Sequence, residues 1–190
     1  CAEMSQRGFL VFSFEYPLAP EASFPQILKD LMTGIGNARA YFETYDGDES
    51  CIYMTGTSAG ASLCVYLAAM LGSPELAEAF EIVPAKLYIR ALGLVSGMYY
   101  TTKLDSIGIF LPSYIYGKQW KKSSFYPYID PENEAIIRHL PPSFLVTAYG
   151  DMLRNYSRQY AEAMKRGGAI CHLEDFEAGK KLPHAFSTTF

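Results

Sequence analysis

The chain has 190 residues, a formal net charge of −4 at pH 7 and a sequence pI near 5.4. Hydrophobic residues make up 49% and charged residues 19%, which is ordinary for a globular domain and excludes wholesale disorder. The acidic balance, without basic clusters, indicates no nucleic-acid partner. No stretch approaches the roughly 18 consecutive apolar residues of a membrane span, so we expect none. The aromatic share of 15% is the one unusual value.

The cysteines show neither a C-x-x-C pattern nor a Cys/His spacing typical of metal sites. They are Cys1, Cys51, Cys64 and Cys171. Two of them lie in strongly apolar stretches, as small core residues do, so we expect free thiols rather than disulfides. Free thiols favour a reducing compartment such as the cytoplasm. We expect neither a metal site nor a cofactor.

The first part of the chain predicts a strand and a helix. Residues 9–16 form a nearly continuous apolar and aromatic run, which is typical of a buried strand. Two prolines break the run in residues 16–21. From Pro25 onward, apolar residues recur at three- and four-residue spacing and predict an amphipathic helix that ends near Tyr45.

The rest of the chain alternates between predicted strands and helices. Strands are expected at residues 51–55, 90–96, 143–149 and 169–176, and helices at 59–71 and 154–166. This alternation indicates βαβ crossovers and therefore an α/β protein with a mostly parallel sheet and helices on both faces. We expect one domain over residues 1–190, with an aromatic-rich insertion at about 97–135, where no steady periodicity appears.

The segment Gly56-Thr57-Ser58-Ala59-Gly60 lies where a predicted strand passes into a predicted helix. This is the pattern of a nucleophile elbow, in which small residues on both sides of the serine permit a strained turn. The turn would expose the Ser58 hydroxyl and aim the backbone N–H of Ala59 at a developing oxyanion. The other interpretation is an ordinary Gly/Ser turn without catalytic function.

A nucleophilic serine needs a base, and on this fold the expected order along the chain is serine, acid, histidine. His139 precedes a strand, and His172 lies within one, where a packed or surface role is more typical. His184 follows the last predicted strand in a Pro-flanked loop that can fold over the sheet edge. Its position selects it as the candidate base.

The candidate acid is Asp151, which directly follows the strand at 143–149. The carboxyl ends of parallel strands are where α/β proteins build active sites. Asp151 could instead cap the helix at 154–166, and the two roles can coexist. Asp175 and Glu177 are weaker rivals, because they lie on or just past the strand that precedes His184.

Several motifs occur in a characteristic order. They are Tyr16-Pro-Leu-Ala-Pro-Glu21, Phe24-Pro25, the Gly-Thr-Ser-Ala-Gly elbow, Pro141-Pro142-Ser-Phe, Asp151-Met-Leu-Arg and His184-Ala-Phe186. Together they resemble the hormone-sensitive-lipase-like branch of the α/β-hydrolase esterases. The resemblance implies an α/β-hydrolase fold and a small-molecule ester substrate, with a short acyl chain. It assigns Ser58 as nucleophile, Asp151 as acid and His184 as base, acting through an acyl-enzyme.

Two other functions share this fold. A prolyl-peptidase-like serine hydrolase has the same triad order, although the Tyr-Pro-Leu-Ala-Pro-Glu segment favours the esterases. A non-catalytic binding protein of the same fold has lost the catalytic histidine, and the presence of His184 argues against it. An inactive fragment is the remaining possibility.

The sequence departs from the esterase pattern in three places. Thr57 replaces an acidic residue, Pro17 stands in the family's Tyr-Arg-Leu motif, and Ala185 replaces a glycine. The family also carries a His-Gly-Gly-rich oxyanion loop and about three strands upstream of the segment that matches Gln6-Arg7-Gly8-Phe9. We therefore expect the chain to be the carboxyl-terminal portion of such a fold, with an exposed strand edge and impaired activity on its own.

Residues 97–130 hold nine aromatic side chains, which is a concentrated share of the unusual aromatic content. In the resembled fold, elements that line the acyl site are inserted here, and aromatic rings suit such a pocket. Packing of irregular structure onto the sheet is an equally good interpretation.

Overall fold

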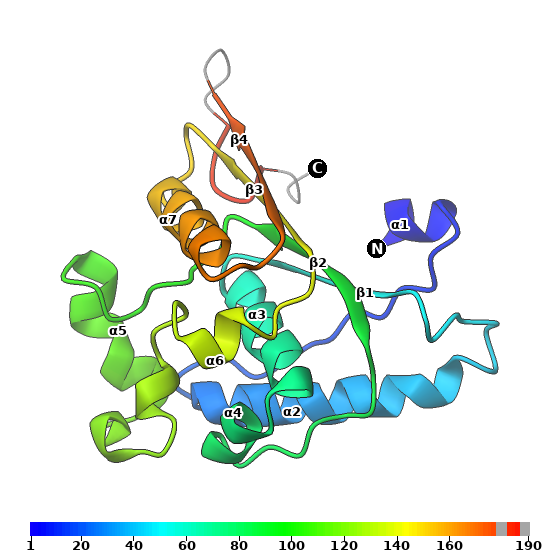
Figure 1. Cartoon of the computed structure of the whole chain (residues 1–190), viewed down its shortest axis with the longest axis horizontal. Helices are drawn as coiled ribbons and strands as arrows, with labels where there is room; N and C mark the ends of the chain where they lie inside the picture. Colours follow the sequence, from blue (N-terminus) through cyan, green and yellow to red (C-terminus); the bar gives the residue numbers. More distant parts are fainter. Residues whose placement is uncertain (178–181, 187–190) are drawn as a thin grey trace.

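The computed structural model describes residues 1–177 and 182–186, and its centre is a parallel sheet (Figure 1). The strands are β1 (Ile52–Thr57), β2 (Ile89–Val95), β3 (Ser143–Ala148) and β4 (Cys171–Phe176). They lie in the order β1-β2-β3-β4, and every neighbouring pair is parallel. The predicted α/β class and these four strands are confirmed. All four strands end at the same edge, where the candidate residues follow them.

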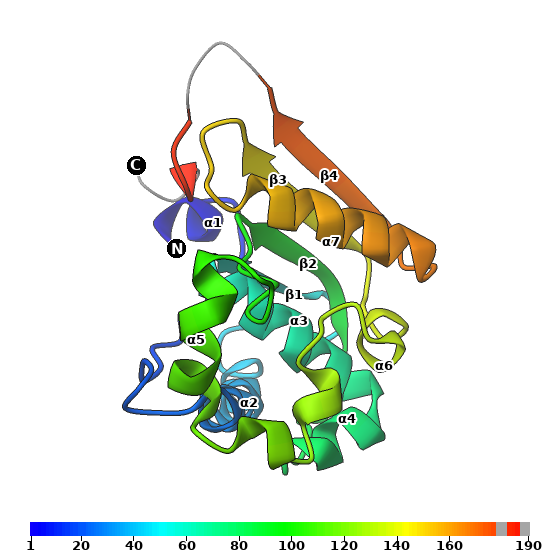
Figure 2. The same cartoon turned by 90° about the vertical axis from the view of Figure 1, so that its left-hand side faces the viewer.

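Helices occupy the crossovers and the flanks of the sheet (Figures 1 and 2). They are α1 (Ala2–Gln6), α2 (Phe24–Ala38), α3 (Ala59–Gly72), α4 (Pro74–Ala79), α5 (Ser106–Tyr116), α6 (Glu134–Ile137) and α7 (Arg154–Arg166), with 3-10 turns at Arg39–Tyr41, Trp120–Lys122 and Tyr126–Tyr128. Helix α3 packs on β1 and β2, and α7 packs on β3 and β4. None of the helices in the described ranges is long and apolar enough to cross a membrane.

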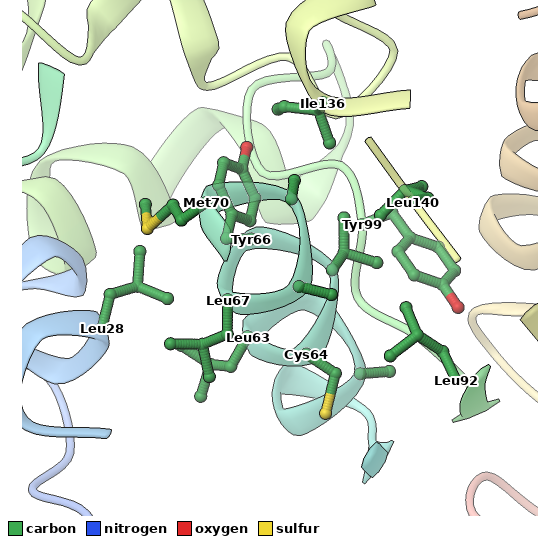
Figure 3. Packing of buried hydrophobic residues seen from close by; sticks show 14 of the residues in the cluster. Leu28, Leu63, Cys64, Tyr66, Leu67, Met70, Leu92, Tyr99, Ile136 and Leu140 are labelled. Atoms are coloured by element: carbon green, nitrogen blue, oxygen red, sulfur yellow. The ribbon is translucent and has the colours of Figure 1, made fainter. Parts of the chain in front are cut away.

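The core surrounds α3, whose residues 61–70 are all buried. Figure 3 shows Leu28 of α2, Leu92 of β2 and Ile136 of α6 reaching this helix from three directions. Each large apolar side chain that is buried in this way contributes about 1.5–3 kcal/mol. A helix enclosed on all sides is rigid, so its first residues are held firmly against the end of β1.

The second face of the sheet is less covered than the face that carries α3 and α7. Tyr53 is 51% and Phe144 47% exposed, and both point away from the buried face because strand side chains alternate. His172 stacks on Phe144 with ring centroids 5.1 Å apart. His172 is therefore a surface strand residue, as the sequence predicts.

The prediction of a buried strand at residues 9–16 is wrong. The segment forms no strand, and Phe9, Leu10 and Phe14 are each about two-fifths exposed. Among the described residues, β1 has β2 as its one strand neighbour, so its outer edge is unpaired. Composition identifies an apolar extended segment, but a strand also needs a partner at hydrogen-bonding distance. Phe9 reaches β1 only through its ring, which lies 6.1 Å from the ring of Tyr53.

The unassigned stretch after β2 contains α5, two 3-10 turns and α6. Helix α5 carries no charged residue and has Pro112 in its interior, so it shows no clear amphipathic period. Its start is nevertheless a normal cap, because Asp105 Oδ1 accepts the N–H groups of Ile107 and Gly108 at 3.0 and 2.9 Å.

Candidate active site

The sharp turn between β1 and α3 depends on two glycines. A Cβ on Gly56 would lie 2.3 Å from the carbonyl oxygen of Gly60, closer than any real contact. This approach leaves Ser58 with φ 56° and ψ −118°, a strained conformation for a residue with a side chain. The predicted nucleophile elbow is therefore present as a backbone geometry.

Ser58 stands immediately before α3 without capping it. Its side chain makes no capping hydrogen bond to α3 within the described ranges, although a serine at this position commonly makes one. The backbone N–H of Ala59, the first residue of the helix, has no intrahelical acceptor and lies at the positive end of the helix dipole. The turn thus places a hydroxyl and a free N–H donor side by side.

Asp151 is buried and accepts hydrogen bonds from several groups around it. His184 Nδ1 lies 2.8 Å from Oδ1 of Asp151, whose side chain is fully buried while that of His184 is 27% exposed. The Leu153 N–H donates to Oδ1 at 2.9 Å, and the Thr147 hydroxyl donates to Oδ2 at 3.0 Å. Asp151 therefore both anchors the turn into α7 and binds the candidate base.

The surroundings of Asp151 favour its ionised form. Burial alone would raise the pKa of this carboxyl, but hydrogen bonds from Ser96, the Leu153 N–H, His184 and Thr147 outweigh burial and lower it. An ionised carboxylate can only accept hydrogen bonds. In the neutral imidazole of His184, the proton of this hydrogen bond is therefore on Nδ1, which leaves the lone pair on Nε2.

Backbone contacts connect Ser58 to this pair. The Ser58 N–H donates to the carbonyl of Val95 at 2.9 Å, at the end of β2. The next residue, Ser96, accepts the N–H of Ala185 on its hydroxyl at 3.2 Å and helps to lower the pKa of Asp151. The structure thus brings Ser58, Asp151 and His184 to the same edge of the sheet.

Sequence reasoning missed Ser96 and Thr147, both of which are completely buried. Ser96 is the last residue of the predicted strand at 90–96, at the edge where the candidate acid is expected, so its position was the available signal. Thr147 is a single polar residue inside an apolar strand, and nothing in the local pattern separates it from an ordinary strand threonine.

The rival residues lie elsewhere or are already paired. His139 is beside Gly72, at the end of α3 opposite to Ser58. Asp175 is 2.8 Å from the Nε of Arg154, and Glu177 also pairs with that guanidinium. Neither acid is hydrogen-bonded to His184 within the described ranges, which leaves Asp151 as its carboxylate partner there.

An apolar cavity of about 110 Å³ begins beside the elbow. Ala59 forms part of its wall, together with residues from the first loop, α2, α3 and the segment that follows β2. Several of the aromatic residues line it: Tyr16, Phe24, Tyr66, Tyr99 and Tyr116. Burial raises the pKa of Tyr116 to about 12, so its hydroxyl is uncharged at neutral pH. Other aromatic residues of the insertion lie outside the cavity, and Phe125, for example, stacks on Phe80.

The strained serine turn, the order of the strands and the buried acid paired with a late histidine are together typical of the α/β-hydrolase fold. The chain belongs to the alpha/beta hydrolase fold family, whose model matches residues 1–188. The predicted family is therefore confirmed.

The most informative relatives are esterases by name. The chain is 26% identical over 178 residues to a probable isoprenylcysteine α-carbonyl methylesterase of Arabidopsis thaliana, with 88% of the chain and 37% of that protein covered. It is 27% identical over 176 residues to the carboxylesterase NlhH of Mycobacterium tuberculosis, with coverages of 87% and 54%. The chain thus spans about half or less of these curated relatives.

Solved structures support the fold. Esterase B from Lactobacillus rhamnosis superposes with a TM-score of 0.87 at 18% identity, covering 98% of this chain and 61% of that one. An arylesterase superposes with a TM-score of 0.64 at 24% identity, with coverages of 90% and 56%.

We predict that Gly56→Ala destabilises the protein by at least about 2 kcal/mol, because the added methyl would meet the backbone of Gly60. Gly36→Ala is the matched control: its Cβ would meet Ala85 Cβ at an ordinary 3.6 Å, and alanine favours a helix by up to about 1 kcal/mol. Urea unfolding of both variants measures the difference. Equal effects of the two substitutions would contradict the assigned turn.

We also predict a specific loss of stability in acid. The pKa of Asp151 is lower in the folded protein than in the unfolded chain, so its contribution is complete above the unfolded-chain value of about 3.9 and is lost as the pH falls through the folded-state value. The free energy of unfolding should therefore fall more steeply below about pH 4 in the wild type than in Asp151→Asn. Urea unfolding at a series of pH values tests this, and parallel curves would refute it.

Proposed function

We propose that the protein hydrolyses carboxylic esters, with Ser58 as nucleophile, His184 as base and Asp151 as the orienting acid. The observation that carries the proposal is the 2.8 Å hydrogen bond between His184 Nδ1 and Asp151 Oδ1 at the sheet edge where Ser58 occupies its strained turn. Membership of the family alone would not be enough, because one fold hosts many functions.

The proton chemistry follows from the tautomer that Asp151 selects. With Nδ1 donating to the carboxylate, Nε2 of His184 can accept the hydroxyl proton as Ser58 Oγ attacks the ester carbonyl. The carbonyl oxygen becomes an anion, and the N–H of Ala59 is the donor that this chain offers to it. When the C–O bond breaks, His184 returns the proton to the departing alcohol and leaves an acyl-enzyme on Ser58. Water, deprotonated by His184, then attacks the acyl carbon, and His184 returns the proton to Ser58 Oγ as its bond to the acyl group breaks and the acid is released.

The cavity beside Ala59 is proposed to hold the acyl group. Its wall is apolar apart from neutral hydroxyls, which suits a hydrocarbon chain and disfavours a charged one. An apolar cavity of about 150 Å³ is enough to hold benzene. A cavity of about 110 Å³ therefore fits an acyl chain of roughly four carbons or fewer.

Two observations favour ester hydrolysis over the rival functions. A hydrolase-fold binding protein has no need of a base, whereas His184 is present and is paired with Asp151. A prolyl peptidase would have to accept a peptide, and the cavity that adjoins Ala59 is small and apolar.

We predict that a fluorophosphonate probe labels the wild-type chain at Ser58, because the probe reacts with a serine that an adjacent base activates. Ser58→Ala should abolish labelling, and His184→Ala should slow it by roughly 10³-fold or more. Intact mass spectrometry and peptide mapping locate the adduct. Ser73→Ala is the control, because Ser73 lies at the opposite end of α3, outside the cavity, and accepts the N–H of Leu76 on its hydroxyl.

An unlabelled Ser58, in protein that circular dichroism shows to be folded, would overturn the hydrolase proposal and favour a binding protein. Turnover of para-nitrophenyl acetate and of alanyl-prolyl anilides separates the esterase from the peptidase.

We predict that kcat/KM for para-nitrophenyl esters falls as the acyl chain grows from butanoyl to octanoyl. Ile115→Ala enlarges the cavity from α5 and should raise the octanoyl-to-butanoyl ratio by about 10-fold, since each buried CH2 is worth about 0.8 kcal/mol. Ile109→Ala on the same helix is the control, because Ile109 is 62% exposed and lies outside the cavity. A ratio that responds equally to both substitutions would place the acyl group elsewhere.

A further inference from the structure

The hydroxyl of Ser96 contacts the segment that carries the candidate base, where that base meets the candidate acid. We propose that Ser96 is a positioning residue of this site, whose hydroxyl holds the backbone next to His184 in place beside Asp151. This inference rests on the proposed ester hydrolysis, in which the Asp151–His184 pair must hold its geometry while Ser58 reacts.

One hydrogen bond ties the Ser96 hydroxyl to the segment that carries the base: its oxygen accepts the N–H of Ala185 at 3.2 Å. The same side chain helps to lower the pKa of Asp151, because a hydroxyl beside a carboxyl favours the ionised form. Ser96 therefore holds the backbone next to His184 and favours the ionised acid that lies 2.8 Å from His184 Nδ1.

The backbone of Ser96 is itself firmly placed. Its N–H donates to the carbonyl of Val146 at 2.8 Å, which ties it to β3 a few residues before Asp151. The preceding residue, Val95, accepts the N–H of Ser58 at 2.9 Å. The hydroxyl is thus held at a fixed position relative to the nucleophile as well as the acid.

The backbone conformation at position 96 favours glycine, yet the residue there is a serine. Ser96 has φ 50°, in the left-handed region that glycine adopts at less cost than any residue with a side chain. Ala185, which donates to the hydroxyl, also has a positive φ, of 60°. Two strained residues therefore meet through one hydrogen bond, and a glycine at position 96 would relieve the first strain while removing the hydroxyl.

Two substitutions separate the hydroxyl from the backbone. Ser96→Ala removes the hydroxyl and keeps the strain, whereas Ser96→Gly removes both. We expect either variant to lower kcat for an alkyl ester by roughly 10- to 100-fold, the value of a hydrogen bond to a charged group, with KM changed by less than about twofold. The loss should be smaller for a para-nitrophenyl ester, because that leaving group needs little protonation by His184.

Ser157→Ala is the matched control. Ser157 is 1% exposed, lies on α7, and its hydroxyl has no hydrogen-bond partner in the described part of the chain. This variant should keep both kcat and the preference between leaving groups. A loss equal to that of Ser96→Ala would mean that any buried hydroxyl has the same effect and would overturn the proposal.

A second measurement does not depend on turnover. The Nδ1 proton of His184, bound to a carboxylate, should give a downfield proton NMR signal that exchanges slowly in the wild type and in Ser157→Ala. In both Ser96 variants this signal should broaden or exchange faster. Loss in Ser96→Ala but not in Ser96→Gly would assign the effect to strain, and an unchanged signal in both would refute the link.

The two proposals fail in different ways. A wild type that is not labelled at Ser58 overturns ester hydrolysis, while the NMR comparison still decides whether Ser96 holds the Asp151–His184 pair. A wild type that is labelled, with Ser96 variants that turn over alkyl esters normally, leaves hydrolysis intact and overturns the role of Ser96.

Discussion

The close approach of Gly56 to Gly60 is the constraint on which the site depends. It lets β1 turn into α3 without an intervening loop, so the buried, rigid helix begins directly at the end of that strand. The strain at Ser58 persists because both neighbours are fixed: the strand by its ladder to β2 and the helix by the core around it. The strained conformation of Ser58 is thus maintained by the strand pairing of β1 and by the core that surrounds α3.

The parallel sheet brings residues that are distant in the sequence together at one of its edges. The residues that follow β2 and β3 meet at one edge because those strands run in register, and Ser96 and Asp151 are the first buried polar side chains there. His184 comes from a segment beyond β4 and is held at this edge by side-chain and backbone hydrogen bonds. Buried polar networks of this kind define one arrangement, because each unsatisfied member would be costly.

The predictable parts of this protein are those whose signal is local. The elbow is specified by five consecutive residues, and the four strands by short apolar runs between turn residues. Asp151 and His184 could be selected because strand ends and chain order restrict the choice. The segment at 9–16 has an equally strong local signal and still forms no strand, since pairing depends on a neighbour that its own residues do not encode. Ser96 and Thr147 were missed for a related reason: their importance comes from Asp151, which is distant in sequence.

The order of the three candidate residues along the chain also has a consequence for biosynthesis. Ser58 comes before the other two residues, and its turn can form once β1, α3 and β2 have assembled, but His184 follows β4. During synthesis the strained serine therefore exists before the segment that carries His184. In the proposed reaction the Ser58 hydroxyl has no base during that interval, so the position of His184 after β4 would delay the chemistry until these four strands have been made.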